Sequence, residues 1–384
     1  MSNHMFNYEK EIKKLENQLL KLSKNAREKY VIELNNELNL LISRKTKEIK
    51  NKLRLNKIDE NKKNIPAKNF LSNQNLEKLP SWVKEEIEES FIVGNSKKVI
   101  QTPDKKKYHL DNKLNDLSGG EWTFFLNSVI TTRYSTSGHD SYAHEIRKIH
   151  PSPKPPQLMR DIIEFFTKEN DLVFDFFMGV GGTLLGASLC NRKAIGIDLE
   201  DKYISAYKKA SKKLNLVEQK TLQTDSVNFL KNKSKFSKFL NNEEIDLILI
   251  DPPYGDMMAR EKTGEAAKNK KSSEATPFTN MEIDLGNMEW VKFREVFKDT
   301  IQNATKNLKD KGHLVIFIKD LQPKNGAPNL LHADLINDIN NVDGINYLGT
   351  KIWGDLSVNL YPYGYPHSYV SNQIHQYILI FRKG

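Results

Sequence analysis

Four consecutive residues, Asp251-Pro252-Pro253-Tyr254, carry the most chemically specific pattern in this sequence. They follow the apolar run Ile245–Ile250, in which only Asp246 is charged, so a buried β-strand is expected to present them at its carboxyl end. A carboxylate, two rigid prolines and an aromatic ring at such a point can grip a planar ring by its exocyclic amine. The pattern therefore indicates methylation of a nucleobase.

The amine of adenine or cytosine is a poor nucleophile, because its lone pair is delocalised into the ring. If Asp251 and the carbonyl of Pro252 each accept one N–H, the nitrogen becomes tetrahedral and its lone pair points at a methyl donor. Asp251 would also stabilise the cation that develops on the amine. Pro252 and Pro253 lack N–H groups and have a fixed φ, so they hold that carbonyl outside a regular sheet ladder. Tyr254 can stack on an extruded base. The alternative without a catalytic role is an ordinary strand end followed by a Pro-Pro turn and a core tyrosine.

A second pattern lies about seventy residues earlier in the chain. The strand-like segment Asp171–Phe177 runs into the turn Met178-Gly179-Val180-Gly181-Gly182-Thr183, and an apolar, helix-forming stretch follows. Glycines allow a ligand to approach the backbone closely, and the helix amino terminus beyond them favours a carboxylate. The next strand, Lys193–Leu199, contains Asp198, which is placed to accept from both hydroxyls of a ribose. The turn by itself could equally serve a dinucleotide or pack a helix on a strand.

These motifs resemble, in order, those of the S-adenosylmethionine-dependent amino-methyltransferases that modify adenine N6 or cytosine N4 in DNA. The resemblance covers residues 150–384, starting with the segment His150–Leu158, which resembles the one that closes over the methionine end of the cofactor. It implies S-adenosylmethionine as the cofactor. The residues that it assigns to cofactor binding are Pro155, Asp175, Phe177, Gly179, Gly181, Thr183, Asp198 and Asp225, with Asp225 on the adenine. It assigns catalysis to Asp251, Pro252, Pro253 and Tyr254. Phe176 stands where the family usually has proline.

The fold that the resemblance implies is α/β, a Rossmann-like methyltransferase with a mostly parallel seven-stranded sheet and an antiparallel hairpin at one edge. The C-terminal pattern agrees with it, because predicted strands and helices alternate. A helix is expected over Phe293–Leu308, a strand over Gly312–Asp320, a helical piece over Asp334–Ile339, and the hairpin from Ile345–Trp353 with Gln376–Phe381. Ligands should bind outside the carboxyl ends of the parallel strands.

The expected reaction is transfer of a methyl group to adenine N6 in double-stranded DNA, with the target base flipped out. Aspartate in the catalytic motif favours adenine, because cytosine-N4 enzymes of the family more often carry serine there. Cytosine N4, or an exocyclic amine in structured RNA, is the first alternative, since RNA-guanine enzymes share a similar tetrapeptide. A nucleic-acid-binding module that has lost activity is the second, and the joint presence of Asp251, Asp198 and the glycines argues against it.

Net charge and length suggest three regions. The formal net charge is +10, which favours a polyanionic partner, and residues 1–70 hold 17 Lys and Arg against 9 Asp and Glu. Residues 1–65 are expected to be a basic, α-helical, coiled-coil-like segment, because apolar residues recur from Ile12 to Ala26 and again from Leu34 to Leu41. These helices could support a homodimer. Residues 66–149 are expected to be an accessory region, and residues 150–384 the catalytic domain.

Target recognition is expected from residues 1–149 or from two loops of the catalytic domain. The loop Asp256–Asn287 is polar and basic, and the segment Tyr361–Tyr369 carries four tyrosines between two strands. The first loop could instead be a solvated insertion with no contact role. The second could instead pack its tyrosines against its own domain. A restriction partner, if there is one, would be a separate protein.

Composition narrows the remaining choices. Cys190 is the only cysteine, which excludes intrachain disulfides and a cysteine zinc site. His139 and His144 do not have helical i,i+4 spacing, so no metal site is expected. The sequence contains neither a signal-peptide pattern nor an apolar run of membrane-spanning length, and a cytoplasmic protein with no membrane contact is expected.

Overall fold

The structure is a computed structural model that describes residues 13, 14, 17, 38–47, 65–255, 279, 281–320, 330–362, 365–367 and 369–384. The chain divides into two compact units, residues 1–65 and 66–384. In the first unit, residues 13, 14, 17 and 38–47 are helical, which agrees with the helices expected there. The rest of the predicted N-terminal helices and most of the basic loop Asp256–Asn287 lie outside the described residues.

Residues 65–149 contain short helices and strands. The α-helices are α3 (Ala67–Phe70), α4 (Asn73–Glu77), α5 (Ser81–Glu85), α6 (Gly119–Phe125) and α7 (His144–Arg147), and the 3-10 helices are η1 (Ile87–Glu89) and η2 (His139–Ser141). The strands are β1 (Ile65–Pro66), β2 (Phe91–Val93), β3 (Val99–Gln101), β4 (Lys107–His109) and β5 (Val129–Thr132). Strands β2, β3 and β4 pair antiparallel in a small sheet, whereas β5 joins the main sheet.

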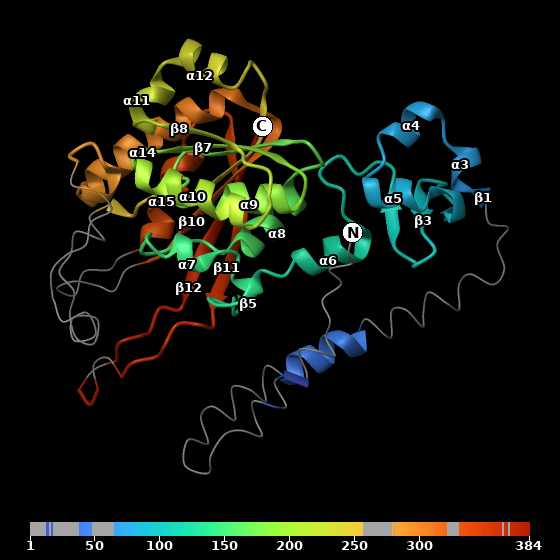
Figure 1. The fold of residues 1–384 in the computed structure, drawn as a ribbon, viewed down its shortest axis with the longest axis horizontal. Helices are drawn as coiled ribbons and strands as arrows, with labels where there is room; N and C mark the ends of the chain where they lie inside the picture. The colour runs from blue at the N-terminus through green and yellow to red at the C-terminus, as the bar shows by residue number, and fades with distance from the viewer. Residues whose placement is uncertain are drawn as a thin grey trace. The chain divides into compact units, whose positions relative to one another are not determined.

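Residues 150–384 alternate between strands and helices, as the sequence predicts. The strands are β6 (Leu172–Asp175), β7 (Lys193–Asp198), β8 (Lys220–Gln223), β9 (Ile245–Ile250), β10 (Leu308–Ile318), β11 (Ile345–Asp355) and β12 (His375–Lys383). The helices are α8 (Pro156–Phe166), α9 (Gly182–Leu189), α10 (Asp201–Lys213), α11 (Ser226–Lys231), α12 (Lys233–Phe239), η4 (Leu285–Asn287), α14 (Trp290–Ala304), η5 (Thr305–Asn307) and α15 (Leu331–Asn340). Helices flank both faces of the sheet (Figure 1).

The main sheet confirms the predicted α/β fold class but differs from the prediction in the number of strands. Its order is β5-β11-β12-β10-β9-β6-β7-β8, so it has eight strands and not the expected seven. Strands β11 and β12 form the predicted antiparallel hairpin, but β5 pairs parallel with β11 and covers the side that was expected to be the sheet edge. The eighth strand was not predicted because β5 has only four residues, which is too short for a recognisable pattern. The sequence around it also contains no clear motif.

Side chains of the central strands point alternately to two cores. Along β9, Leu247 and Leu249 pack in the core formed with α8, α9 and α10, whereas Ile248 and Ile250 pack in the core formed with α11, α12, α14 and α15. This alternation is the period of two that a pleated strand imposes. Because both faces are covered, the strand is apolar almost throughout, which explains why its sequence reads as one continuous apolar run.

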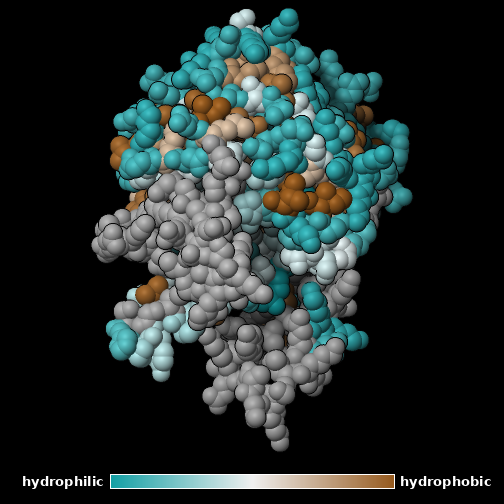
Figure 2. Space-filling view, turned by 60° about the vertical axis from the view of Figure 1, so that its left-hand side comes forward, coloured by the Kyte–Doolittle hydropathy of each residue, from teal (hydrophilic) through white to brown (hydrophobic). Residues whose placement is uncertain are grey.

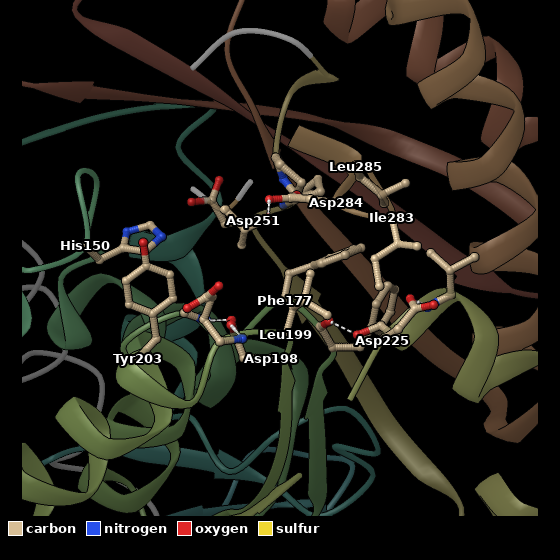
Figure 3. A pocket seen from close by; sticks show the side chains of 18 of the residues that line it. His150, Phe177, Asp198, Leu199, Tyr203, Asp225, Asp251, Ile283, Asp284 and Leu285 are labelled. Carbon is tan, nitrogen blue, oxygen red and sulfur yellow. Dashed lines mark hydrogen bonds between the residues drawn. The ribbon is translucent and has the colours of Figure 1, made fainter. Parts of the chain in front are cut away.

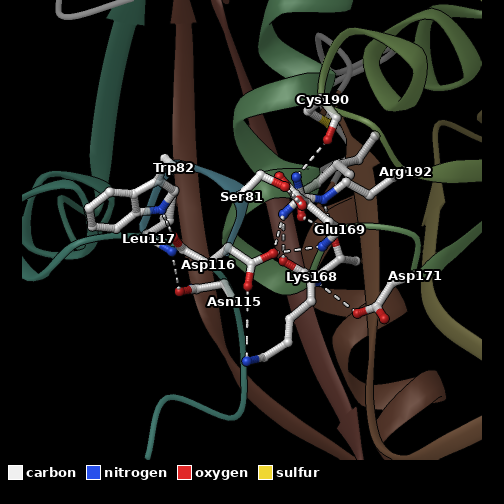
Figure 4. Close-up of polar contacts among 12 residues, drawn as sticks. Ser81, Trp82, Asn115, Asp116, Leu117, Lys168, Glu169, Asp171, Cys190 and Arg192 are labelled. Carbon is white, nitrogen blue, oxygen red and sulfur yellow. Dashed lines mark hydrogen bonds and ion pairs between the residues drawn. The ribbon is translucent and has the colours of Figure 1, made fainter. Parts of the chain in front are cut away.

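A buried polar network joins residues 66–149 to residues 150–384 (Figure 4). Oδ2 of Asp116 accepts a hydrogen bond from the backbone N–H of Glu169 at 2.6 Å and lies 3.4 Å from Nη2 of Arg192. The indole N–H of Trp82 donates to the carbonyl of Asp116 at 2.7 Å. Burial raises the pKa of Asp116, so this carboxylate depends on its partners to remain charged. Asp116 therefore ties the accessory region to the end of α8 and the start of β7.

On the face shown in Figure 2, polar side chains cover most of the described surface and apolar residues form separate, small patches. Tyr365 and Tyr369, in the segment between β11 and β12, are 81% and 91% exposed. Within the described part of the chain, no helix is long and apolar enough to cross a membrane.

The Asp116 network provides a stability test. Asp116→Ala should lower the free energy of unfolding by about 3 kcal/mol, because it leaves the largely buried guanidinium of Arg192 without its counter-charge. Chemical denaturation monitored by circular dichroism measures the change. Glu243→Ala, which breaks the exposed pair with Lys193, is the control and should change stability little. Equal effects of the two substitutions would contradict the role given to Asp116.

Candidate active site

The glycine turn between β6 and α9 forms one wall of a cavity at the carboxyl edge of the sheet. Gly179 and Gly181 have φ of +48° and +73°, so both adopt the left-handed conformation that favours glycine. Asp198, at the end of β7, accepts a hydrogen bond from the N–H of Gly179 at 2.8 Å and another from Glu200 at 2.9 Å. The turn is thus fixed to the neighbouring strand, with the Asp198 carboxylate beside it.

The cavity has a volume of about 830 Å³, part of it open to solvent. Its lining residues come from the ends of β6, β7, β8 and β9 and from the segments around them: His150, Ser152, Phe176, Phe177, Gly179, Asp198, Leu199, Glu200, Tyr203, Asp225, Ser226, Val227, Asp251, Pro252, Pro253, Tyr254, Thr279, Ile283, Asp284 and Leu285. His150 and Tyr203 lie at one end and Asp225 and Ile283 at the other, with Asp198 between them (Figure 3).

The structure brings together eight of the twelve predicted site residues at this cavity. These are Phe177, Gly179, Asp198, Asp225, Asp251, Pro252, Pro253 and Tyr254. The other four lie just behind it. Asp175 and Thr183 are buried at the end of β6 and in the first turn of α9, Gly181 is the N-cap of α9, and Pro155 is the N-cap of α8. These four can shape the turn without lining the cavity.

The segment Asp251–Tyr254, predicted to be catalytic, reaches this cavity from the end of β9. Oδ1 of Asp251 accepts a hydrogen bond from the Tyr254 hydroxyl at 2.8 Å, and Oδ2 lies 2.5 Å from Nζ of Lys154. The ring of Tyr254 is only 6% exposed and belongs to the same buried core as Phe293. In this structure Tyr254 therefore orients the carboxylate of Asp251, and its expected stacking on a base stays a prediction. Burial raises the pKa of Tyr254 well above its usual value, so the hydroxyl keeps its proton and donates.

Burial also changes the protonation of other groups at the site. It raises the pKa of Asp175 to about 7 and that of Asp198 to about 6, and it lowers the pKa of His150 to about 4. His150 is therefore neutral near pH 7, and its ring lies edge-on to Tyr203 with centroids 4.8 Å apart. Neutral His150 makes this end of the cavity polar without adding positive charge.

Three functional candidates at the site were not assigned from the sequence. His150 and Lys154 lie in the segment that resembles the one closing over the methionine end of the cofactor. That resemblance was the sequence signal for this segment, but it gave neither residue a role of its own. Asp284 lines the cavity and accepts hydrogen bonds from Thr279 and from the N–H of Gly286, both at 2.8 Å. It belongs to a polar loop without periodicity, and nothing in that loop's sequence distinguishes Asp284 from its neighbours.

S-adenosylmethionine fits the cavity by its chemistry. Apolar side chains of Phe177, Leu199, Val227 and Ile283 lie near Asp225, as an adenine ring requires, and Asp198 can accept from ribose hydroxyls. Gly179 lines the cavity without a side chain, and its φ of +48° favours glycine, so the backbone there stays open to a ligand. Carboxylates dominate the charged groups that line the cavity, which suits a cationic sulfonium.

The eight-stranded sheet and this cavity define a Rossmann-like methyltransferase. A family model described as DNA methylase matches residues 1–209, more than half of the chain. The chain belongs to this family of amino-methyltransferases, whose methyl donor is S-adenosylmethionine. The matched residues include the glycine turn and Asp198 and end before Asp251.

Individual relatives match shorter segments. The tRNA (guanine(10)-N2)-dimethyltransferase of Methanocaldococcus jannaschii is 33% identical over 151 residues, covering 38% of this chain and 41% of the relative. The type II methyltransferase M2.LlaDCHI of Lactococcus lactis subsp. cremoris is 46% identical over 60 residues, 16% of this chain and 22% of the relative. The chain thus spans less than half the length of either relative. Thermus thermophilus TrmN aligns with 60% of this chain and 48% of its own, with 14% identity and a TM-score of 0.36.

Packing around the glycine turn predicts a large effect of Gly181→Ala. A Cβ at Gly181 would lie 2.2 Å from Cδ2 of Tyr207, whereas Gly344, with a similar φ of +71°, has nothing within 4 Å. Gly344→Ala should therefore cost only the backbone strain, about 1 kcal/mol. Gly181→Ala should cost about 1–3 kcal/mol more through overpacking and should weaken donor binding. Thermal unfolding and calorimetric titration with S-adenosylmethionine measure both effects, and equal behaviour of the two variants would contradict the packing argument.

The raised pKa of Asp198 predicts that donor binding depends on pH. Ribose hydroxyls donate to the ionised carboxylate, so the affinity for S-adenosylmethionine should fall as the pH drops through about 6. At pH 5 roughly one Asp198 in ten is ionised, which weakens binding about tenfold relative to pH 8. Calorimetric titration between pH 5 and 8 measures this dependence. Asp198→Asn should bind more weakly with a flatter pH dependence, and an equally steep loss in that variant would assign the titration to another group.

Proposed function

We propose that the protein transfers a methyl group from S-adenosylmethionine to the exocyclic amine of a nucleobase. One observation carries the proposal: the carboxylate of Asp251, at the end of β9, opens into the same cavity as Gly179 and Asp198. An amine bonded to Asp251 would meet a methyl donor held along the glycine turn. This is the arrangement that in-line transfer requires.

The chain contributes position and electrostatics to this reaction. When bound, S-adenosylmethionine supplies an electrophilic methyl group. Asp251 accepts one N–H of the acceptor amine, and the carbonyl of Pro252 accepts the other, so that the nitrogen lone pair is directed into the cavity. Negative charge on Asp251 stabilises the cation that forms on the amine, and the buried hydroxyl of Tyr254 keeps the carboxylate in one orientation.

The extent of similarity favours structured RNA as the acceptor, with guanine N2 as the target. The tRNA guanine relative matches over 151 residues, against 60 residues for the type II methyltransferase. RNA enzymes act on bases that are unstacked or can be splayed out, and guanine N2 is an exocyclic amine of the kind that Asp251 would hold.

Adenine N6 in double-stranded DNA is the second candidate. The family model is that of DNA methylases, and the catalytic motif carries aspartate and not serine. In a duplex the target base would have to leave the stack to reach Asp251 at the cavity wall, which requires base flipping. The net charge of +10 suits either nucleic acid.

Product analysis distinguishes the two substrates. The purified chain is incubated with methyl-labelled S-adenosylmethionine and either unmodified tRNA transcripts or unmethylated plasmid DNA, and the nucleosides are separated by mass spectrometry. N2-methylguanosine is the expected product, and N6-methyladenine in DNA would establish the second candidate. Methylation of a ring carbon or of a sugar hydroxyl would refute the proposal.

Asp251→Ala tests the role of the carboxylate. Transfer should fall by at least about 10³-fold, because the main acceptor for the developing cation is removed, while the affinity for S-adenosylmethionine stays nearly unchanged. Asp140→Ala, at an exposed carboxylate outside the cavity, is the matched control and should retain full activity. Turnover by Asp251→Ala at the wild-type rate would show that another group holds the amine.

A further inference from the structure

Lys154 is a buried lysine that bonds to Asp251, and the mechanism proposed above gives it no role. Its side chain is 7% exposed, and Nζ lies 2.5 Å from Oδ2 of Asp251 and 5.2 Å from the ring centroid of Phe317. An ammonium group removed from water needs a specific partner, because the loss of its hydration is unfavourable. Asp251, whose side chain is 19% exposed, provides that partner.

The backbone of Lys154 packs against the glycine turn. A Cβ on Gly182 would lie 2.8 Å from the carbonyl oxygen of Lys154, so the two backbones are in close contact. Nη1 of Arg147 donates to the same carbonyl at 2.8 Å, and Arg147 is itself 1% exposed. The position of Lys154 relative to the donor turn is therefore set by packing and by a buried hydrogen bond.

Lys154 thus links the two halves of the site. Its main chain packs on the turn along which the donor would lie, and its ammonium group bonds to the carboxylate that would hold the acceptor. Near-attack geometry needs the distance between these two places fixed to a fraction of an ångström. The Tyr254 hydroxyl fixes the other carboxylate oxygen, so Asp251 is held from both sides.

The acidic residues around the cavity give a second reason for a cation beside Asp251. Asp198, Glu200, Asp225 and Asp284 line the same cavity as Asp251, and Asp175 is buried behind it. Acidic groups that lie close together repel one another electrostatically. The ammonium group of Lys154 offsets that repulsion directly at Asp251.

We propose that Lys154 is a positioning residue for methyl transfer, which holds the carboxylate of Asp251 in the orientation that receives the acceptor amine, at a fixed distance from the donor turn. Each carboxylate oxygen can accept more than one hydrogen bond, so Oδ2 can receive the N–H of the acceptor while Lys154 stays bound. The inference rests on the proposed function, because it presupposes that Asp251 receives the acceptor amine.

Three substitutions of Lys154 test this role on the full chain, with tRNA transcripts and plasmid DNA as acceptor probes. Lys154→Met keeps the length of the side chain but removes its charge, and kcat should fall about 100-fold, as expected for a misplaced reacting group. The KM for the acceptor and the Kd for S-adenosylmethionine should change by no more than about threefold. Lys154→Arg keeps the charge and should recover part of the lost kcat.

Chemical rescue separates positioning from a merely structural role. Lys154→Ala leaves room for n-propylammonium, which replaces the deleted atoms, and this salt should raise the kcat of the variant at least about tenfold, whereas sodium chloride at equal ionic strength should not. Lys319→Met removes a neighbouring lysine, half-buried beyond the end of β10, and serves as the matched control with near wild-type kcat.

The role of Lys154 and the proposed function would be contradicted by different results. Wild-type kcat in Lys154→Met, or a loss that follows only the melting temperature and that neither arginine nor n-propylammonium restores, would overturn the role of Lys154 while Asp251→Ala stays inactive. Wild-type turnover by Asp251→Ala would instead overturn the proposed function. The same kinetic assays on the Lys154 and Asp251 variants provide both tests.

Discussion

The site depends on one geometric constraint: β8, β7, β6, β9 and β10 run parallel, so their carboxyl ends meet at one edge of the sheet. Residues far apart in the sequence, such as Asp198 and Asp251, then line a single cavity. Helices on both faces keep the strands buried, and the cavity forms only where the strands end. A ligand at this edge is surrounded by backbone turns, which can approach it closely, and by side chains that the sheet holds in register.

Much of this arrangement could be predicted from the sequence. The run Ile245–Ile250 has the bounds of β9, and the glycine turn lies between β6 and α9 as expected. These predictions succeeded because each depends on local rules: an apolar run bounded by prolines, or glycines where the backbone needs positive φ. Asp198 could be located for the same reason, since the carboxyl end of a parallel strand gives a side chain a known position, whereas Asp225 was assigned through the family resemblance.

The remaining features arise from contacts between distant segments. The pairing of β5 with β11 joins residues separated by more than two hundred positions, and a four-residue strand contains too little pattern to reveal it. The ion pair of Lys154 with Asp251 is a contact across 97 positions, and a lysine between prolines resembles any solvated loop lysine. The burial of Tyr254 was likewise hidden, because a tyrosine after Pro-Pro is compatible with either an exposed or a core position.

The pairing of β5 with β11 has a consequence for how the enzyme can be divided. Nζ of Lys351, 4% exposed on β11, donates to the carbonyl of Phe125 at 2.6 Å and also bonds to that of Asn127. A fragment that began at residue 150 would lose these acceptors and would leave Ile352–Asp355 of β11 without their partner strand. Unpaired strand edges template aggregation, so a fragment without β5 should be more prone to associate through this end of β11 than the full chain.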